Sequence, residues 1–385
     1  MISIRDANLN GKVVFLRVDF NVPIKDGKIL DNYRITRALS TIQYLLERKT
    51  KIIIATHLGK PAGEIIPDLS TIPLASELAK LLKHKVYATD HVIHPTVTKK
   101  IEEMNFGDVL MLGNLRWHKE EEQNNERFAE ELASYADIYV NDAFGASHRA
   151  HASIDAITNF LPSYGGFLLE SEKTTLDLLV RSPQKPYIIV LGGAKVKDKS
   201  GLINNLAMMA DKILIGGAIA NTFLAARGTD ISESLYEREM FETCEGIMAK
   251  FKDKILLPED QIKEESANGK FKIMDIGPNT IELFKREIAA GKTVFWNGNM
   301  GYSEDQKYEN GTRKIAEAIS QNNGTTVVAG GDTVGFINQN NLSGNINFIS
   351  TGGGATLNYL AGEKMPGLFA LEKKSIVSNV EEPKL

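Results

Sequence analysis

Charged and polar side chains gather where apolar segments end in the first half of the sequence. Asp19 and Asn21 follow one such segment, Arg116 follows another, and Arg34 lies on a helical pattern between them. Two further segments are followed by His57, Gly59, Lys60, His148, Arg149 and His151. Arginine forks bind phosphate and carboxylate groups through paired hydrogen bonds, and lysine adds a positive charge. We therefore expect this half of the chain to bind a small anionic ligand.

Glycines take the corresponding positions in the second half. The apolar segments there end in Gly192–Gly193, Gly216–Gly217, Gly298, Gly330–Gly331 and Gly352–Gly354. Any single pair is explained by a tight turn from strand to helix. Glycine lets a phosphate approach the backbone, and the N-terminus of a following helix supplies N–H donors. The recurrence of such places therefore indicates a nucleotide across the edge of a sheet.

Charged and hydroxyl side chains accompany these glycines. Lys195 and Lys199 are four residues apart, which places them on one face if the segment is helical. Asp332 and Thr333 stand at the start of a predicted helix. A carboxylate there either caps the helix or holds Mg²⁺ on a nucleotide phosphate, and the sequence leaves both open. Glu304, after a glycine-rich turn, is a candidate acceptor for ribose hydroxyls.

Apolar and amphipathic segments alternate along the chain and predict the elements that position these residues. Strands are predicted at 13–20, 51–56, 108–112, 137–142, 187–193, 212–217, 254–258, 272–277, 293–298, 325–331 and 346–351. Helical periodicity is clear at 31–48, where Asp31 is the expected N-cap, and at 70–83. Strands that alternate with helices predict parallel sheets covered by helices on both faces.

The number of strands indicates two domains, because strongly twisted open sheets rarely exceed about ten strands. We expect an α/β fold with two doubly wound, Rossmann-like parallel-sheet domains joined by a helical hinge. The break is expected near 160–186, where 167–180 is predicted to form a stiff connecting helix.

Composition excludes several classes of protein. Of the 385 residues, 43% are hydrophobic and 24% are charged, which is typical of a globular and not a disordered chain. The single cysteine, Cys244, excludes a disulfide scaffold and is expected to be buried and unreactive in a reducing cytoplasm. No run approaches the ~18 apolar residues of a membrane span. The N-terminus lacks the apolar core of a signal peptide. A net charge of −4 argues against a nucleic-acid partner.

Two local similarities carry no function. Gly291–Thr293 resembles the end of a phosphate-binding P-loop, but Arg286 stands where that motif needs its first glycine. His84, His91 and His94 lie among lysines without a carboxylate or thiol at matching spacing. Surface histidines are therefore favoured over a metal site.

Longer strings resemble one family. RVDFNVP, THLGKP, LGNLRWHKEEE, NDAFGASHRAH, LGGAKVKDK, WNGNMGYSED, AGGDTV and STGGGATLNYLAGEKMPGLFAL are similar to phosphoglycerate kinases in order and spacing, over residues 1–374. The resemblance implies an N-terminal domain at 1–165 for 3-phosphoglycerate or 1,3-bisphosphoglycerate and a connecting helix at 166–182. It further implies a C-terminal domain at 183–366 for ADP or ATP with Mg²⁺, and a segment at 367–385 that packs partly on the N-terminal domain.

The resemblance also implies roles for single residues. The phosphoglycerate site would consist of Asp19, Phe20, Asn21, Arg34, His57, Leu58, Gly59, Lys60, Arg116 and Arg149. The nucleotide site would consist of Lys199, Glu304, Gly330, Gly331, Asp332 and Thr333, with Asp332 as the magnesium ligand. Arg34, Lys195 and Lys199 would be catalytic, and Lys195 and Arg34 resemble the groups that meet the phosphoryl group during transfer.

The implied activity is reversible phosphoryl transfer between 1,3-bisphosphoglycerate and ADP, in glycolysis, by a cytoplasmic monomer. The ADP β-phosphate and the phosphoglycerate carboxylate are both ionised at pH 7, so neither direction needs a general base. What remains is in-line positioning and neutralisation of the charge on the transferred group. Closure of the hinge is expected to exclude water.

Some positions depart from the pattern of the family. Lys60 replaces the usual arginine, which keeps the charge but loses bidentate geometry. Asn299 replaces a proline, which we expect to loosen a turn near the nucleotide. The other departures are Gly113, Trp117 and Asn32–Tyr33. They leave two alternatives open: a catalytically weak relative that serves as a scaffold, and a two-domain kinase for another acyl phosphate.

Overall fold

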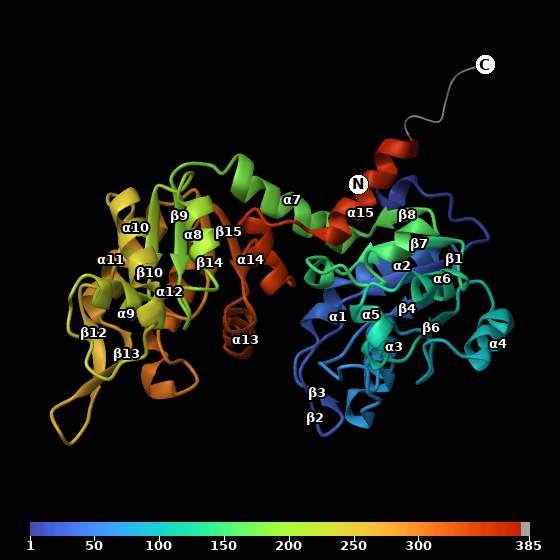
Figure 1. The fold of residues 1–385 in the computed structure, drawn as a ribbon, viewed down its shortest axis with the longest axis horizontal. Helices are drawn as coiled ribbons and strands as arrows, with labels where there is room; N and C mark the ends of the chain where they lie inside the picture. Colours follow the sequence, from blue (N-terminus) through green and yellow to red (C-terminus); the bar gives the residue numbers. More distant parts are fainter. Residues whose placement is uncertain (379–385) are drawn as a thin grey trace, which may run out of the picture. The chain divides into compact units, whose positions relative to one another are not determined.

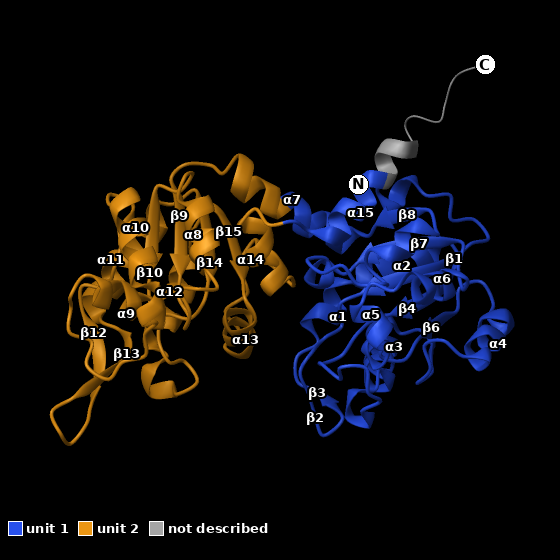
Figure 2. Cartoon of the chain, viewed as in Figure 1, with its two compact units in different colours: residues 1–174, 364–385 blue, residues 175–363 orange. Residues whose placement is uncertain are grey.

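The computed structural model describes residues 1–378, with side chains described through Lys373. The chain forms two compact units, residues 1–174 with the segment from Lys364 onward, and residues 175–363 (Figure 2). The division falls inside helix α7 (Phe167–Arg181), within the segment expected as a connector. Each unit contains a sheet of six parallel strands with helices on both of its faces (Figure 1). The predicted α/β fold with two doubly wound parallel sheets is therefore confirmed.

The sheet of the first unit has the strand order β5–β6–β4–β1–β7–β8. Its strands are β1 (Val13–Val18), β4 (Lys51–Ala55), β5 (Val86–Ala88), β6 (Val109–Met111), β7 (Ile138–Asp142) and β8 (Ser163–Gly165). Val14 in β1 pairs with Ile52 of β4 on one side and with Ile138 of β7 on the other. The strands are nearly continuous apolar runs because helices cover both faces of the sheet.

The sheet of the second unit has the strand order β11–β10–β9–β14–β15–β16. Its strands are β9 (Tyr187–Leu191), β10 (Lys212–Ile215), β11 (Ile255–Leu256), β14 (Thr293–Asn297), β15 (Thr325–Ala329) and β16 (Phe348–Ile349). From β9 the chain builds one side of the sheet and then, from β14, the other. The junction of β9 and β14 is therefore the topological switch point, where parallel sheets bind ligands outside the carboxyl ends of the strands.

Helices connect the strands and cover the sheets. In the first unit they are α1 (Tyr33–Arg37), α2 (Leu39–Glu47), α3 (Ile72–Leu82), α4 (Pro95–Glu103), α5 (Lys119–Glu122), α6 (Glu126–Ala133) and α15 (Pro366–Ser378). In the second unit they are α8 (Ser200–Leu206), α9 (Gly217–Ala226), α10 (Phe241–Lys250), α11 (Pro278–Ala290), α12 (Asn310–Ser320), α13 (Gly331–Gln339) and α14 (Gly354–Leu360). Ile42 and Leu45 of α2 join the buried core that contains Val14 and Leu16 of β1.

The structure corrects two predictions about elements. The strand predicted at 272–277 is confirmed as β13 (Phe271–Ile276), but it does not join a large parallel sheet, because it pairs antiparallel with β12 (Gln261–Glu265) in a separate hairpin. Its turn contains Asn268–Gly269, with Gly269 at φ +77°, and this dipeptide between two strands is a hairpin signal. The predicted helix 31–48 is two helices that meet at Ala38, and Asp31 Oδ1 accepts the N–H of Tyr33 at 2.7 Å one residue before the observed cap.

Helix α15 belongs to the first unit, although it lies at the end of the chain. The N–H of Gly367 donates to the carbonyl of Ser147 at 3.0 Å, and the helix contacts β8 and the short 3₁₀ helix η5 (Ala156–Asn159). A Cβ at Gly367 would lie 2.7 Å from Cγ2 of Ile154, so glycine permits this close approach. Residues 379–385, part of the expected segment 367–385, lie outside the described residues.

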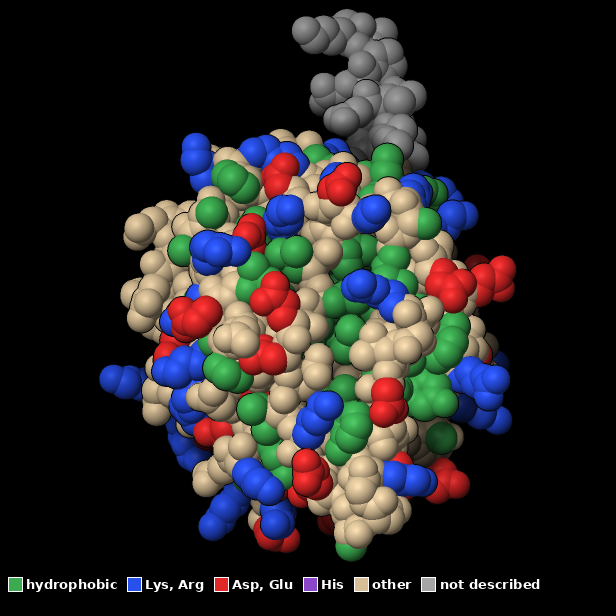
Figure 3. All heavy atoms as spheres, turned by 90° about the vertical axis from the view of Figure 1, so that its left-hand side faces the viewer, with side chains coloured by type: hydrophobic (Ala, Val, Ile, Leu, Met, Phe, Trp, Pro, Cys, Tyr) green, Lys and Arg blue, Asp and Glu red, His purple; other side chains and the backbone are tan. Residues whose placement is uncertain are grey.

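The structure also bears on the membrane-spanning, disulfide-linked and nucleic-acid-binding classes of protein considered from composition. Within residues 1–378, no helix is long and apolar enough to cross a membrane. Cys244 is buried, and burial raises the pKa of its thiol to about 12. On the face that Figure 3 shows, basic and acidic side chains are interspersed with small groups of hydrophobic ones.

Candidate functional site

The carboxyl ends of four strands bring the polar side chains of the first unit to one edge of its sheet. Asp19 follows β1, His57 follows β4, Arg116 follows β6 and Arg149 follows β7. The chain builds β4 on one side of β1 and later β7 on the other, so this edge includes the topological switch point of the sheet. The residues predicted to bind an anion thus lie where parallel sheets bind ligands.

Asp19 and Arg34 form an ion pair at this edge, with Nη1 of Arg34 2.7 Å from Oδ2 of Asp19. Oδ1 of Asp19 accepts the N–H of Asn21 at 3.2 Å. Burial opposes the ionisation of Asp19, but the neighbouring cations, Arg34 first among them, outweigh burial and hold its pKa below the ordinary value. Asp19 is therefore anionic and orients the guanidinium of Arg34, whose side chain is 26% exposed.

The loop at 57–60 is held through its backbone. Oδ1 of Asn21 accepts the N–H of Gly59 at 2.9 Å. Asn114 bonds both the N–H of Leu58, at 3.2 Å, and its carbonyl, at 2.7 Å. Gly59 has φ +63°, and a Cβ there would lie 2.9 Å from Leu69, so this loop requires glycine.

The cationic side chains of this edge differ in exposure. Lys60 and Arg149 are exposed, and Arg34 is partly exposed. Arg116 is buried, and its Nη1 donates to the carbonyl of Gly59 at 3.0 Å. The solvent-facing positive charge therefore comes from Lys60, Arg149 and Arg34, while Arg116 braces the loop.

His57 and Phe20 are buried at the same edge. Burial, with the charge of Arg17, lowers the pKa of His57 well below its ordinary value, so the ring is neutral at pH 7. The side chain of Phe20 is fully buried, and its N–H donates to Thr56 Oγ1 at 3.0 Å. The carbonyl of Phe20 accepts the N–H of Val22 at 2.9 Å, so Phe20 supports this edge through its buried ring and its backbone bonds.

A buried ionic network under this edge was missed by the sequence analysis. Arg17 lies in β1 and is fully buried, with its Nε 2.8 Å from Ser153 Oγ and its Nη2 3.3 Å from His57 Nδ1. Glu121, also fully buried, lies 3.8 Å from Arg17 and accepts the hydroxyl of Ser153 at 2.6 Å. The available signal was the basic residue inside the apolar run 13–20, because a charge is buried only when it is paired.

His151 lies beside the same network and is neutral. Its Nδ1 is 3.8 Å from Glu121 Oε1. Burial and the charges of surrounding arginines, Arg116 first, lower its pKa to about 3. His151, named in the sequence analysis as one of the polar residues after β7, is therefore uncharged at pH 7.

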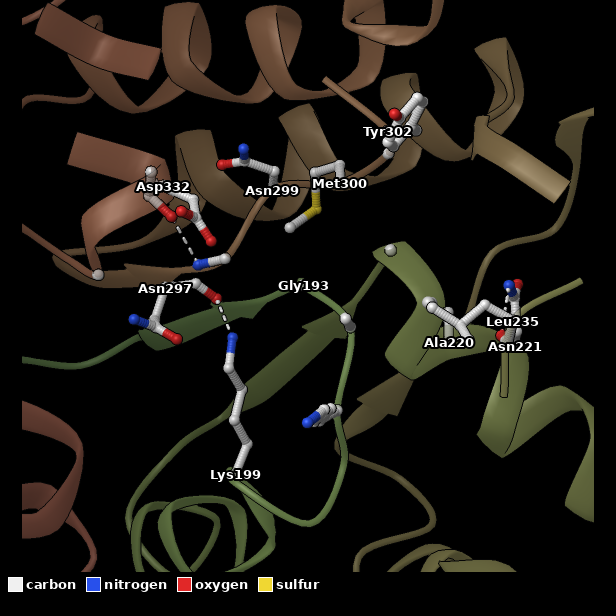
Figure 4. Close-up of a pocket in the computed structure, with 18 of the residues that line it drawn as sticks. Gly193, Lys199, Ala220, Asn221, Leu235, Asn297, Asn299, Met300, Tyr302 and Asp332 are labelled. Carbon is white, nitrogen blue, oxygen red and sulfur yellow. Dashed lines mark hydrogen bonds between the residues drawn. The ribbon is translucent and has the colours of Figure 1, made fainter. Parts of the chain in front are cut away.

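The second unit contains a cavity of about 640 Å³ at the switch point of its sheet. The predicted residues that line it are Lys195, Lys199, Glu304, Gly330, Gly331, Asp332 and Thr333, with Gly193, Gly217 and Gly298. Figure 4 shows Lys199, Asn297 and Asp332 at one end of the cavity and Ala220, Asn221 and Leu235 at the other. The structure thus brings together the predicted nucleotide residues, with Lys199 and Asp332 at one end and Ala220 and Leu235 at the other.

The backbones that follow β9 and β14 approach each other closely at the floor of this cavity. The N–H of Gly192 donates to Asn297 at 2.9 Å, and the N–H of Gly193 donates to Asn299 at 2.8 Å. Gly298 has φ +95°, and a Cβ there would lie 2.2 Å from the carbonyl oxygen of Gly192. This crossing therefore excludes any side chain at position 298.

Lys199 is buried at the floor of the cavity. Its ammonium donates to the carbonyl oxygen of Gly192 at 2.5 Å. It also donates to the carbonyl oxygen of Asn297 at 3.2 Å, the bond that Figure 4 draws. Burial lowers its pKa to about 8, and the charge of Asp332 opposes that shift. Helix α8 begins at Ser200, so Lys195 and Lys199 do not share a helical face as their spacing had suggested. Lys195 is exposed on the loop.

The start of α13 carries the predicted carboxylate and hydroxyl. Thr333 Oγ1 accepts the N–H of Gly298 at 2.8 Å, which ties the helix to the crossing. Asp332 is exposed in the first turn, and the residue at the cap position is Gly330. Asp332 is therefore not the N-cap, and its carboxylate faces the cavity lining instead.

The carboxylate of Asp332 at this end of the cavity fits Mg²⁺ that is bound together with a nucleotide. Carboxylate oxygen suits this hard cation, which proteins commonly hold through one or two carboxylates and the phosphates of the substrate. Within the described part of the chain, no group of three or more His, Cys, Asp or Glu forms a metal cage. The carboxylate of Asp332 would supply one ligand to such a metal, and phosphate and water would supply the others.

The turn that carries Glu304 is fastened at several points. Nδ2 of Asn299 donates to Ser303 Oγ at 2.6 Å, so the residue that we expected to loosen this turn bridges it. The N–H of Tyr302 donates to Met274 of β13 at 2.8 Å. The sequence analysis missed this support, because it placed 272–277 in the large sheet instead of the hairpin that lines the cavity.

Asp275 also supports this wall. Its Oδ2 accepts the N–H of Gly311 in α12 at 2.6 Å, and burial raises its pKa to about 6. A Cβ at Gly301 would lie 2.3 Å from Asp275 Oδ1, so the turn and the carboxylate are packed in contact.

Comparisons with known proteins agree on one family. The family described as phosphoglycerate kinase matches residues 4–363. Phosphoglycerate kinases of Pseudothermotoga lettingae and Dictyoglomus turgidum are 43% and 44% identical, over 97% of this chain and 99% of each relative. The solved phosphoglycerate kinase of Coxiella burnetii is 34% identical, with a TM-score of 0.85 over 97% of this chain and 99% of that one. The solved phosphoglycerate kinase of Pyrococcus horikoshii is 32% identical, with a TM-score of 0.87 over 98% of this chain and 100% of that one.

Proposed function

The chain belongs to the phosphoglycerate kinase family, and on that premise we propose that it transfers a phosphoryl group between 1,3-bisphosphoglycerate and ADP in both directions. The products are 3-phosphoglycerate and ATP. We further propose that the enzyme works as a cytoplasmic monomer in glycolysis. It needs Mg²⁺ bound to the nucleotide.

The cavity of the second unit carries this proposal. One end holds the ammonium of Lys199 and the carboxylate of Asp332, and the other holds Ala220 and Leu235 (Figure 4). A nucleotide has the same polarity, with charged phosphates at one end and a flat, less polar base at the other. The proposed orientation places the phosphates against Lys199 and the N-terminus of α13, whose unpaired N–H groups favour anions. Glu304 accepts from the ribose hydroxyls.

The proposed phosphoglycerate half-site uses the exposed cations of the first unit. Lys60, Arg149 and Arg34 bind the phosphate and carboxylate groups, while the buried Arg116 and the partly exposed Asn21 hold the loop that carries Gly59. Asp19 orients Arg34 through their 2.7 Å ion pair. Each unit provides groups for one substrate, so transfer requires a closed state in which both substrates meet and water is excluded.

The proposed chemistry is direct in-line transfer. Both possible nucleophiles are already anionic, and the chain's task is to position them and to neutralise the three oxygens of the moving group. Lys195 and Arg34 supply positive charge to that group, and Lys199 anchors the phosphates. Mg²⁺, held by Asp332 and the nucleotide, would supply further charge neutralisation.

A coupled assay tests this function. The protein is given 3-phosphoglycerate, ATP and Mg²⁺, and NADH oxidation is followed through added glyceraldehyde-3-phosphate dehydrogenase. Turnover is expected with all three components and lost when any one is omitted. A folded protein that binds ATP but shows no turnover would favour a scaffold, or a kinase for another acyl phosphate.

A further inference from the structure

The loop that carries Lys195 is fastened by a distant carboxylate. Oε2 of Glu237 accepts the N–H of Val196 and, at 3.3 Å, the N–H of Lys197. These are the two residues that directly follow Lys195. Hydrogen bonds to an ionised acceptor are roughly twice as strong as those between neutral groups.

Two successive backbone N–H groups that point at one oxygen form a small anion-binding concavity. In this loop Glu237 fills that concavity from within the chain. The two amides are therefore engaged by protein, and the loop offers a ligand the side chains of Lys195 and Lys199 and not these N–H groups. Val196 is fully buried and forms the apolar anchor of the same segment.

Glu237 is itself held by the wall of the cavity. Its N–H donates to Oγ1 of Thr222, a fully buried residue of α9, at 3.2 Å. The neighbouring Asn221 donates through Nδ2 to the carbonyl of Leu235 at 3.2 Å. Both Asn221 and Leu235 line the cavity. The carboxylate thus connects the Lys195 loop to α9.

Helix α9 is in turn fixed to the crossing of β9 and β14. It begins at Gly217, with φ +63°, where a Cβ would lie 2.7 Å from the nitrogen of Gly193. The N–H of Gly217 donates to Met300 at 2.8 Å. A continuous series of contacts therefore leads from the floor of the cavity through α9 and Glu237 to the backbone beside Lys195.

We propose that Glu237 is a positioning residue that sets the backbone of the Lys195 loop and so places the Lys195 ammonium for phosphoryl transfer. The inference rests on the proposed function, because it assigns Glu237 an effect through Lys195. Lys199 is fixed by its own bonds to Gly192 and Asn297. Lys195 is exposed, and the location of its side chain depends on the loop backbone.

The test compares Glu237→Ala and Glu237→Gln with Glu233→Gln, a matched control. Glu233 lies four residues earlier, and its carboxylate pairs at 3.0 Å with Lys270 in the turn between β12 and β13. In Glu237→Ala we expect kcat to fall ~10-fold or more, with KM for ATP changed less than ~3-fold, because a transition-state contact is lost. Glu237→Gln keeps one acceptor oxygen, so we expect its kcat to lie between that of wild type and that of Glu237→Ala. Glu233→Gln should behave as wild type.

Two further readouts separate positioning from general destabilisation. Hydrogen exchange at Val196 and Lys197 should accelerate in Glu237→Ala and remain slow in Glu233→Gln. In a Lys195→Ala background, Glu237→Ala should lower kcat by less than ~2-fold, because residues that act through one group are not additive.

Unchanged exchange at these amides, or an equal loss of kcat with and without Lys195, would overturn the proposal. If Lys195→Ala loses turnover and Glu237→Ala keeps it, only the positioning role fails. If Lys195→Ala itself keeps wild-type turnover, the proposed role of Lys195 fails as well.

Discussion

The ammonium of Lys199 donates to the backbone carbonyl of Asn297 at 3.2 Å, across the junction of β9 and β14. The same nitrogen bonds Gly192 at the end of β9, so one buried cation joins the two strand ends that form the floor of the cavity. Lys199 is therefore part of the framework of the cavity as well as the proposed anchor of the nucleotide phosphates. Removing the charge of Lys199 should therefore weaken both the floor of the cavity and the binding of the nucleotide phosphates.

Nucleotide use should depend on pH through Lys199. Burial lowers its pKa to about 8, so the free enzyme loses this positive charge as the pH rises through that value. We expect kcat/KM for ATP to fall above pH ~8, because this parameter reports pKa values of the free enzyme. In Lys199→Arg the charge persists, and the alkaline fall should disappear from this range. A profile that is flat to pH 9.5, or one that Lys199→Arg leaves in place, would contradict the assignment.

Lys195 should contribute mainly to the transition state. It is exposed on a loop beside the cavity and is proposed to meet the phosphoryl group during transfer. Lys195→Ala should lower kcat by ~100-fold or more while the Kd of ATP changes less than ~3-fold. Calorimetry and steady-state kinetics measure the two quantities. Unchanged turnover, or a loss explained by weaker ATP binding, would remove Lys195 from this role.

Lys60 should limit affinity for phosphoglycerate. Its ammonium is a point charge at an exposed position where the family usually has a bidentate guanidinium. Lys60→Arg should lower KM for 3-phosphoglycerate by ~2-fold to ~5-fold, because a guanidinium binds a phosphate or carboxylate through two parallel hydrogen bonds. KM for ATP serves as the internal control and should not change. An equal or higher KM for 3-phosphoglycerate would show that lysine suits this loop.

The Arg17–Glu121 pair should be a major determinant of the stability of the first unit. Both side chains are fully buried, and the hydroxyl of Ser153 bonds to the carboxylate beside them. Arg17→Met leaves Glu121 as a buried charge without its cation, at an expected cost of about 3–5 kcal/mol. The double variant Arg17→Met with Glu121→Gln should recover part of that loss in urea unfolding. A single variant as stable as wild type would contradict this reading of the network.

Asp142 should make stability decrease between mildly acidic and neutral pH. Burial raises its pKa from 3.8 to about 7, so between these values the folded protein holds a proton that the unfolded chain has released. Stability therefore falls as pH rises through this window. Asp142→Asn has no carboxyl group to titrate at this position. The urea midpoint of Asp142→Asn minus that of wild type should therefore rise between pH 5 and pH 8.

Asp260 is the matched control for that experiment. Its hydrogen bonds to Thr280 and Asn279 outweigh the effect of burial and lower its pKa below 3.8. Above pH 5 the carboxyl group of Asp260 is then ionised in both the folded and the unfolded state. The difference between Asp260→Asn and wild type should stay constant from pH 5 to pH 8, and a matching rise in both variants would refute the role of Asp142.

Sequence could predict much of the site because strand ends of parallel sheets converge on one edge. Asp19 and His57 are found there by that rule alone, and Gly330–Thr333 lie at the predicted helix start. Hydrogen bonds from a side chain to a distant part of the backbone could not be predicted from the sequence. The bond between Glu237 and the N–H of Val196, for example, depends on tertiary packing. Lys195 and Lys199 would share one face only if their segment were helical, and the helix begins only after Lys199. Arg17 was overlooked inside an apolar run.

The central claim is direct transfer between ATP and 3-phosphoglycerate, and a single-turnover experiment with ATP labelled at its γ-phosphate tests it most directly. With wild-type protein, Mg²⁺ and 3-phosphoglycerate, label should pass to 1,3-bisphosphoglycerate, and none should remain on the protein. The transfer should be lost without 3-phosphoglycerate and strongly reduced in Lys195→Ala. Label retained on the protein, or no labelled product from a protein that binds both substrates, would contradict the account.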